Sequence, residues 1–549
     1  MMLQFVLSAS VVLIAAECSV VITTTGPVRG KLVQDEHVSY YAYLGIPYAE
    51  PPKGDLRFKP PIPKQAWTQV LNATDHGPVC PQPEGKHTRD QMSEDCLYLN
   101  VIVPANVTKK TLPVLVYIHG GSFKSNSGNI DSFYGPEFFV KRGIIYVSMN
   151  YRLGALGYLS LGTDKAPGNA GIKDVLLALK WLNKNIQQFG GSSITIGGQS
   201  SGAATVHYLM LTEKSKGLFN QAILNSGSAT NFRFLAAHPK ENALALADQL
   251  GVQNHDDMEN VVQHLIEADV FDIVDAQESI YKNNRNPMRA FAPFVPSIEK
   301  ESDDAIITEN PTDIIKAGMP QNLPILAGIN GLEGAFMWPS LHKLPSETLK
   351  EIFPLCIPAD IEYPTDSDAY ADLVDSISEL YFGSRNLSKW TQTRFYKLVT
   401  DTQYTYSVDS WIKIHKSRHD SEQLYYYLFD FDGDLNWAKL NYDIEFPGAV
   451  HSDEIGYLFV TPETKPILKN IDTRSQQTLD NILTFVTNFI KHGNPTPEGY
   501  GGKVTWPESG KDRHHLVIND CPEVVSQAPN KIRFDFWEQV YIEYSEYTD

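Results

Sequence analysis

A G-x-S-x-G pattern at residues 198–202, with Ser200 at its centre, is the strongest candidate for chemistry in the sequence. An apolar, strand-like run precedes the pattern and a helix-favouring stretch follows it. The two flanking glycines leave no Cβ to crowd a sharp turn between strand and helix, so the Ser200 hydroxyl can be exposed there as a nucleophile. Glycine and serine are also common in ordinary turns, and the pattern therefore needs catalytic partners elsewhere in the chain.

A serine nucleophile requires a base, and the base requires an acid that fixes its tautomer. Glu333 lies in a glycine-containing loop just after the strand-like run 324–328, and His451 lies in a second such loop at residues 446–454. Taken singly, a Glu in a loop is usually a solvated charge and a lone His is usually a surface or core residue. Together, and in the order serine, acid, histidine, they predict the triad Ser200, Glu333 and His451.

An oxyanion hole is the second requirement of acyl transfer. His119-Gly120-Gly121-Ser122 follows directly after a buried strand-like run, where an H-G-G-type loop would supply backbone donors. A plain glycine turn is the alternative interpretation. We expect the N–H groups of Gly121, Ser122 and Ser201 to form the hole.

The elements around these loops alternate between strand and helix patterns, which predicts an α/β fold with a large, mostly parallel central sheet. A helical pattern over residues 171–189 runs into the strand before Ser200. Runs typical of strands buried on both faces cover residues 97–103, 113–119 and 144–150, and further strands are expected at 221–225 and 324–328.

Three further segments complete the predicted architecture. Residues 241–276 and 346–417 are expected to be helical and loop insertions over the sheet. The proline-rich segment 41–61 cannot be helix and is expected to be irregular structure near a sheet edge. No linker rich in Gly, Pro or Ser divides the chain, so residues 19–549 are predicted to form a single domain.

The composition limits the possible partners. The chain has 549 residues, 42% of them hydrophobic and 20% charged, as in ordinary globular proteins. A formal net charge of −19 argues against nucleic acid or an anionic membrane surface as a partner. Residues 430–434 resemble the start of a calcium loop, but the loop lacks Gly at its sixth position and has Asn441 at its twelfth. This segment is therefore expected to be a turn. Hydrolysis by a serine triad implies neither a metal nor a cofactor.

The N-terminus and the cysteines indicate a secreted, extracellular protein. Residues 1–18 contain an apolar run and are predicted to be a signal peptide cleaved near residues 16–18. No other apolar run approaches membrane-spanning length, so no membrane anchor is expected. Cys80 and Cys96 are the pair closest in sequence and suit a disulfide, whereas Cys356 and Cys521 could pair or remain thiols. The predicted glycosylation sites are Asn72, Asn106 and Asn386.

With these residues assembled, the sequence closely resembles the type-B carboxylesterase/cholinesterase family of α/β-hydrolases from about Gly26 to Glu543. Residues 94–100 (EDCLYLN) match a second signature of that family, and residues 150–154 (NYRLG) stand where its members carry a similar sequence. The resemblance implies an α/β-hydrolase fold, the Ser-Glu-His triad named above and a first disulfide between Cys80 and Cys96. Gln199 and the pattern Gly448-x-x-His451-x-x-Glu454 look most like those of secreted arthropod esterases, of the juvenile-hormone-esterase or odorant-degrading type.

The chain also departs from the family pattern. The segment between Gly191 and Gly198 is about two residues shorter than usual, and Ser122 replaces a Gly or Ala. Residues 81–95 contain no Trp, Tyr or Phe, and Gln199 stands where cholinesterases have a carboxylate. Since quaternary ammonium groups bind through cation–π attraction, choline esters are not expected as preferred substrates. The resemblance places a roomy acyl pocket near Ala290, Phe291, Ala292 and Phe294.

The sequence thus predicts a serine carboxylesterase that hydrolyses small-molecule esters through an acyl-enzyme. A non-catalytic cholinesterase-like binding or adhesion protein is the alternative from another class, because this fold also serves as an ectodomain. A lipase is a third possibility. The physiological ester and the oligomeric state are left open.

Overall fold

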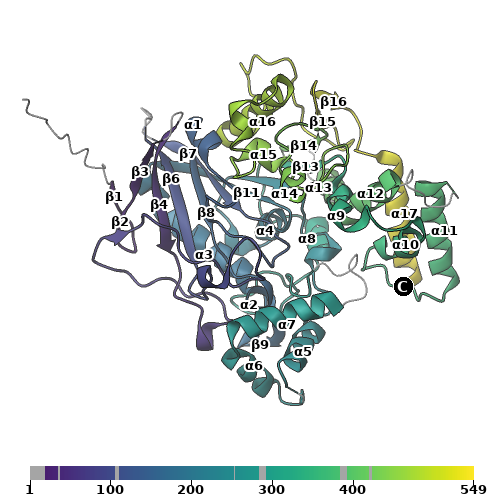
Figure 1. The fold of residues 1–549 in the computed structure, drawn as a ribbon, viewed down its shortest axis with the longest axis horizontal. Coiled ribbons are helices and arrows are strands. Elements are labelled where there is room, and N and C mark those ends of the chain that lie inside the picture. The colour runs from purple at the N-terminus through teal and green to yellow at the C-terminus, as the bar shows by residue number, and fades with distance from the viewer. Residues whose placement is uncertain are drawn as a thin grey trace, which may run out of the picture.

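The centre of the protein is an 11-stranded sheet, seen in the computed structural model, which describes residues 19–34, 38–105, 111–252, 254–283, 292–383, 392–418 and 423–548 (Figure 1). In spatial order its strands are β16 (Glu523–Val525), β15 (His515–Ile518), β14 (Leu424–Phe429), β13 (Ile325–Asn330), β12 (Gln221–Asn225), β11 (Gly191–Gln199), β7 (Leu112–Ile118), β8 (Ile145–Met149), β6 (Tyr98–Pro104), β4 (Ser39–Pro47) and β3 (Lys31–Gln34).

Neighbouring strands from β15 to β8 are all parallel, whereas the pairs at the two ends of the sheet are antiparallel. Every residue of β8 and β13 is buried. Such strands read as continuous apolar runs because helices cover both faces of a parallel sheet. The predicted α/β fold is therefore confirmed.

Helices lie on both sides of the sheet and at its ends (Figure 1). The helices are α1 (Glu137–Lys141), α2 (Gly154–Tyr158), α3 (Ala170–Asn185), α4 (Ser201–Met210), α5 (Pro239–Gln249), α6 (Met258–Glu267), α7 (Val270–Asn283), α8 (Pro311–Ala317), α9 (Trp338–Leu341), α10 (Ser346–Ile352), α11 (Asp368–Phe382), α12 (Gln392–Thr400), α13 (Tyr406–Arg418), α14 (Trp437–Tyr442), α15 (Ile455–Leu458), α16 (Thr473–His492) and α17 (Lys531–Thr548). Smaller sheets pair β1 (Val20–Ile22), β2 (Pro27–Arg29) and β5 (Leu71–Asn72), and β9 (Ser160–Thr163) with β10 (Ala166–Pro167).

The two predicted insertions are helical. Residues 241–276 contribute to α5, α6 and α7, which lie together at the lower edge of the view, and residues 346–417 form α10 to α13 on its right (Figure 1). A π-helical turn, Asp401–Thr405, joins α12 to α13. π-Helical turns are rare and frequently occur at functional sites.

The expectation of irregular structure throughout residues 41–61 is wrong in its first part. Ser39–Pro47 is strand β4, which pairs with both β3 and β6. A register shift between Tyr43 and Ile46 accommodates Gly45, whose φ is +67°. Pro47 is tolerated because it stands at the end of the strand.

The strand that leads to Ser200 is irregular at its start. β11 pairs with β7 in a regular parallel register from Ile194 onward, but the register shifts between Gly191 and Ile194. The shortened segment after Gly191 is thus absorbed before the strand reaches the centre of the sheet.

No helix in the described ranges combines the length and the apolar character that crossing a membrane requires.

Candidate active site

Ser200 stands at the turn between β11 and α4, at the N-cap of the helix. Its backbone is strained, with φ 56° and ψ −124°, in a region that non-glycine residues rarely adopt. The turn is tight: a Cβ added to Gly202 would lie 2.2 Å from the carbonyl oxygen of Ile118, and one added to Gly198 would lie 2.4 Å from the carbonyl carbon of Gly202. The two glycines of the pattern are therefore required by close backbone approach.

Glu333 and His451 are in direct contact. Nδ1 of His451 lies 2.6 Å from Oε2 of Glu333, a side chain with no exposed surface. Glu333 begins a short 3₁₀ helix after β13, and its Oε1 accepts the backbone N–H of Asn330 at 2.7 Å. Both oxygens of the carboxylate are thus fixed by hydrogen bonds. Because Nδ1 carries the proton that is donated to Glu333, Nε2 of His451 is left as the basic nitrogen.

Gln199 occupies the other side of the imidazole. Its side-chain nitrogen lies 3.2 Å from Nε2 of His451 and donates to the hydroxyl of Ser452 at 2.7 Å. With the Nδ1 proton directed at Glu333, Nε2 is the acceptor of the Gln199 amide. Ser200 and His451 line one cavity of about 200 Å³.

The loop after β7 contains Gly121 and Ser122, which line the same cavity. Gly121 has φ +117° and Ser122 has φ +57°, so both are in the left-handed region. For Ser122 this conformation costs roughly 1–3 kcal/mol. Strain of this kind is found where surrounding structure holds a functional loop. Ser201 is the first residue of α4, where free backbone N–H groups and the helix dipole favour negative charge.

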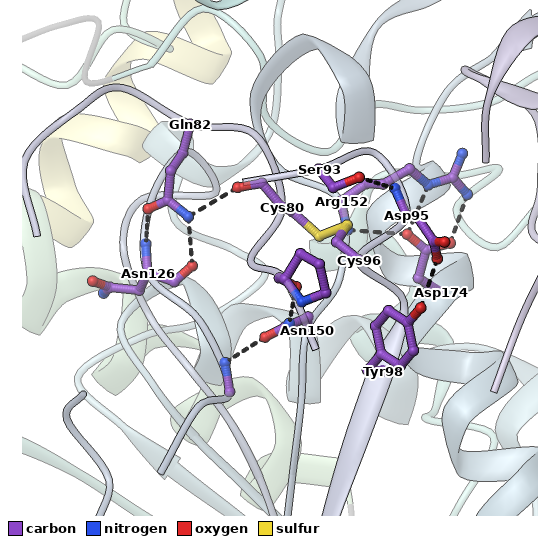
Figure 2. Close-up of a disulfide and its surroundings, with 12 residues drawn as sticks. Cys80, Gln82, Ser93, Asp95, Cys96, Tyr98, Asn126, Asn150, Arg152 and Asp174 are labelled. Carbon is purple, nitrogen blue, oxygen red and sulfur yellow. Dashed lines mark hydrogen bonds and ion pairs between the residues drawn. A yellow bond between two sulfur atoms is a disulfide. The ribbon is translucent and has the colours of Figure 1, made fainter. Parts of the chain in front are cut away.

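A disulfide is connected to this loop through Gln82 and Asn126, and Figure 2 shows these two residues beside it. Cys80 and Cys96 are bonded, as predicted. Gln82, two residues after Cys80, donates to the carbonyl oxygens of Cys80 and Asn126, both at 3.0 Å, and accepts the backbone N–H of Asn126 at 2.8 Å. The side chain of Asn126 in turn donates to the carbonyl oxygen of Gly120 at 3.1 Å. The disulfide loop is therefore linked to the predicted oxyanion loop by hydrogen bonds.

Aromatic side chains make up much of the cavity wall. The Tyr404 ring lies 4.5 Å from the imidazole of His451 and the Phe336 ring lies 5.6 Å from it, measured between centroids. Tyr404 comes from the π-helical turn. The other aromatic residues that line the cavity are Phe133, Tyr134, Trp437 and Tyr442.

A second carboxyl group lies close to Glu333. The side chain of Asn330 donates to Oε2 of Glu454 at 2.6 Å, while its backbone N–H bonds Glu333. Burial, and secondarily the charge of Glu333, raises the pKa of Glu454 to about 8. Glu454 therefore keeps its proton at neutral pH and adds no second negative charge beside Glu333, the partner of His451.

The other predicted residues are distributed as follows. Ala290 and Phe291 of the expected acyl pocket lie outside the described residues; Ala292 lines a neighbouring cavity and Phe294 is buried in the core. Residues 1–18, Asn106 and Asn386 also lie outside the described residues, and Asn72 is exposed in β5. Cys356 is buried and Cys521 is exposed; neither is in a disulfide. In the described ranges, no group of three or more His, Cys, Asp or Glu side chains is arranged to hold a metal ion.

Sequence reasoning missed Lys124, Arg233 and Tyr404, all of which line the cavity with Ser200. Lys124 follows the predicted oxyanion loop, and Arg233 lies in the segment after β12, the strand beside β11. Since ligands of α/β sheets bind beyond the carboxyl ends of the strands, position after a strand was an available signal for both. Tyr404 had no such signal because it lies within a helical insertion.

Comparisons with known proteins agree with this fold. The model of the carboxylesterase family matches residues 17–537. The juvenile hormone esterase of Heliothis virescens is 30% identical over 517 residues, which cover 90% of this chain and 89% of that protein. The juvenile hormone esterase of Tribolium castaneum is 32% identical over 482 residues, 84% of this chain and 81% of that one.

A solved structure of juvenile hormone esterase from Manduca sexta, with OTFP covalently attached, superposes with a TM-score of 0.83 at 28% identity and covers 96% of this chain and 100% of that chain. The family match, the relatives and the shared α/β-hydrolase fold lead to one conclusion. The protein belongs to the carboxylesterase family and is a hydrolase of carboxylic esters.

Proposed function

We propose that the protein hydrolyses esters through an acyl-enzyme on Ser200, with His451 as the base and Glu333 as the acid that orients it. The observation that carries this proposal is the 2.6 Å contact between Nδ1 of His451 and Oε2 of Glu333 beside the strained serine turn. A non-catalytic binding protein would not need a buried pair such as His451 and Glu333 at the cavity that Ser200 also lines.

In the proposed mechanism, Oγ of Ser200 attacks the ester carbonyl carbon while its proton passes to Nε2 of His451. For this to occur the Gln199 amide must release Nε2 as substrate enters. The imidazolium then protonates the departing alcohol, and the negative oxygen of the tetrahedral intermediate is stabilised by N–H groups of Gly121, Ser122 and Ser201. Water activated by His451 then hydrolyses the acyl-enzyme and releases the acid.

Covalent labelling tests the nucleophile. A fluorophosphonate probe should label the wild-type protein at one site, and Ser200→Ala should abolish both labelling and hydrolysis of 4-nitrophenyl acetate. Ser192→Ala is the matched control, because Ser192 is exposed at the opposite end of β11. Stoichiometric labelling of Ser200→Ala would show that another residue is the nucleophile.

We also propose that the protein is secreted after removal of residues 1–18 and that residues 19–549 act as one domain. The Cys80–Cys96 disulfide supports an oxidising compartment, since such bonds rarely persist in the cytosol. Expression in insect cells tests this: we expect active protein in the medium, with an N-terminus near residues 17–19. Protein retained inside the cells with residue 1 still present would contradict the proposal.

A further inference from the structure

The peptide that joins Gly120 to Gly121 carries one of the proposed oxyanion donors, the N–H of Gly121, and Gly121 lines the cavity with Ser200. In a trans peptide the carbonyl and the N–H point in opposite directions, and the described residues contain no cis peptide bond. Whatever holds the carbonyl of Gly120 therefore also aims the N–H of Gly121. Among the described residues, no backbone carbonyl accepts that N–H, so the loop's own backbone does not occupy it.

Two side chains donate to the carbonyl oxygen of Gly120. Nδ1 of His119 lies 2.8 Å from this oxygen, and Nδ2 of Asn126 lies 3.1 Å from it. A carbonyl oxygen can only accept, so Nδ1 of His119 carries the proton in this contact. An imidazole and an amide thus hold the peptide through its carbonyl. Hydrogen bonds on a carbonyl also polarise the peptide and make its N–H a stronger donor.

The two donors differ in what else they support. His119 is buried and stacks on the ring of Tyr151, 4.4 Å away between centroids, and its backbone carbonyl accepts the Tyr151 hydroxyl at 2.7 Å. Replacing His119 would therefore disturb core packing together with the peptide. Asn126 is only partly buried and lines the cavity, so its side chain can be changed with little effect on the core.

The backbone of Asn126 is fixed independently of its side chain. Its φ is +83°, in the left-handed region that Asn and Gly adopt more readily than other residues do. Its N–H donates to Oε1 of Gln82 at 2.8 Å, and its carbonyl oxygen accepts from Nε2 of Gln82 at 3.0 Å (Figure 2). A substitution that tolerates positive φ therefore removes the amide and keeps both backbone contacts.

The next peptide along the loop, which carries the N–H of Ser122, is held differently. The carbonyl oxygen of Gly121 accepts the backbone N–H groups of Lys124 at 3.0 Å and of Ser125 at 3.1 Å, and the hydroxyl of Ser125 at 3.2 Å. A backbone turn thus fixes the Ser122 donor. No backbone N–H of the described residues donates to the carbonyl of Gly120, so the Gly121 donor depends on side chains.

We propose that Asn126 is a positioning residue for ester hydrolysis: its amide holds the carbonyl of Gly120 so that the N–H of Gly121 points at the negative oxygen of the tetrahedral intermediate. The inference rests on the proposed esterase function, and Asn126 acts through Gly121 rather than on the substrate. An oriented donor of this kind acts mainly on the transition state, because the negative charge develops only there. Loss of the amide should therefore lower kcat and leave KM nearly unchanged.

Two variants test this position. Asn126→Gly tolerates the positive φ and removes the amide, so kcat for 4-nitrophenyl acetate should fall by about 10- to 100-fold, with KM changed by less than about threefold. Asn126→Asp keeps the shape but replaces the donor with a negative acceptor that faces the carbonyl of Gly120, so its kcat should fall further. Asn530→Gly and Asn530→Asp are the matched controls and should leave kcat unchanged. Asn530 also has a positive φ, of 52°, and lies directly before α17, away from the cavity lining.

A pair of ketones distinguishes positioning from general structural support. When Oγ of Ser200 bonds to the carbonyl carbon of a trifluoromethyl ketone, the carbonyl π electrons become a negative oxygen and the serine proton passes to His451. The methyl ketone of the same chain length binds without forming this adduct. In Asn126→Gly the Ki of the fluorinated ketone should rise by about the factor by which kcat falls, and the Ki of the methyl ketone should change by less than about threefold. Equal weakening of both inhibitors would overturn the proposal.

The outcomes separate this proposal from the proposed function. Wild-type kcat in Asn126→Gly refutes the role of Asn126 and leaves the esterase mechanism standing. Absence of both hydrolysis and fluorophosphonate labelling in the wild-type protein refutes the mechanism itself. Both Asn126 variants should still be labelled to the wild-type end point, because Ser200 and His451 are unchanged. If Asn126→Asp does not fold, Asn126→Gly decides alone, since it keeps both contacts with Gln82.

Discussion

The side-chain nitrogen of Gln199 lies 3.2 Å from Nε2 of His451, the nitrogen that must accept the proton of Ser200 in the proposed mechanism. The neutral Gln199 amide can donate a hydrogen bond to the unprotonated imidazole, and through Ser452 it is fixed in place at 2.7 Å. This contact makes the pH dependence of the enzyme sensitive to the residue before the nucleophile.

Gln199→Glu should move the acid limb of the pH profile to higher pH. A carboxylate at this distance accepts a hydrogen bond from the imidazolium and favours the charged, non-basic form of His451. The pH at the midpoint of the acid limb of kcat/KM should therefore rise by about 1 pH unit or more. Steady-state kinetics between about pH 5 and 9 measure this midpoint. Gln199→Met, similar in size and neutral, is the control; an unmoved limb in Gln199→Glu would contradict the assigned role of Nε2.

Glu333→Gln should lower kcat by about 10³- to 10⁴-fold, because an amide at this position can stabilise the wrong tautomer of His451 and cannot balance its positive charge. The protein should still fold, since the substitution conserves shape and the amide oxygen can still accept from Asn330. Burst kinetics with a 4-nitrophenyl ester measure the loss of turnover, and circular dichroism of the same variant shows whether it folds. A loss of less than about tenfold would argue against Glu333 as the acid of the triad.

Glu454→Gln should reduce the dependence of stability on pH. The pKa of Glu454 is raised from its ordinary value of 4.5 to about 8, so the folded state binds its proton more tightly than the unfolded state does. Its contribution to the free energy of unfolding is therefore fully present below about pH 4.5 and is lost as the pH rises toward about 8.

Thermal unfolding of wild type and Glu454→Gln between about pH 6 and 9 measures this difference. The Tm of the variant should fall less steeply with rising pH. Some decline will remain, because burial also raises the pKa of Asp409 and Asp453 to about 7. Parallel curves for the two proteins would contradict the prediction.

Removing the disulfide should reduce both stability and turnover. The double variant Cys80→Ala, Cys96→Ala opens a loop with a sequence separation of 16 residues, worth about 3 kcal/mol in the free energy of unfolding. Since Gln82 connects this loop to Asn126, kcat should also fall, while Cys521→Ala, at an exposed free cysteine, should change neither. Unchanged kcat in the destabilised double variant would show that the predicted oxyanion loop does not depend on the disulfide.

Local sequence was sufficient for the features that depend on local conformation. The turn at Ser200 requires glycines on both sides, and the apolar runs of β8 and β13 follow directly from burial on two faces. Ser200, Glu333 and His451 could be selected from the sequence because each lies in a glycine-containing turn or loop.

Features that depend on packing between distant segments could not be read from the sequence. The contact of Gln199 with His451 joins residues 252 positions apart, and the place of Tyr404 against the imidazole depends on a π-helical turn with no sequence signature. β4 was missed because its Gly45 and Pro47, and the prolines that follow the strand, suggest irregular structure, whereas pairing on both sides holds it in the sheet. The charge on Arg233 is evident in the sequence, but the place of its guanidinium beside Tyr404 depends on packing between distant segments.

The location of Ser200 at the end of β11 also bears on how the protein reaches its active form. β11 pairs with β7 and β12, and the proposed acid and base, 118 positions apart, come from loops beyond strands that are added still further along the chain. Non-local parallel pairing must form before these groups meet, and such contacts form late because closing long loops is entropically unfavourable. Nascent chains can therefore be helical and collapsed while still lacking hydrolytic activity.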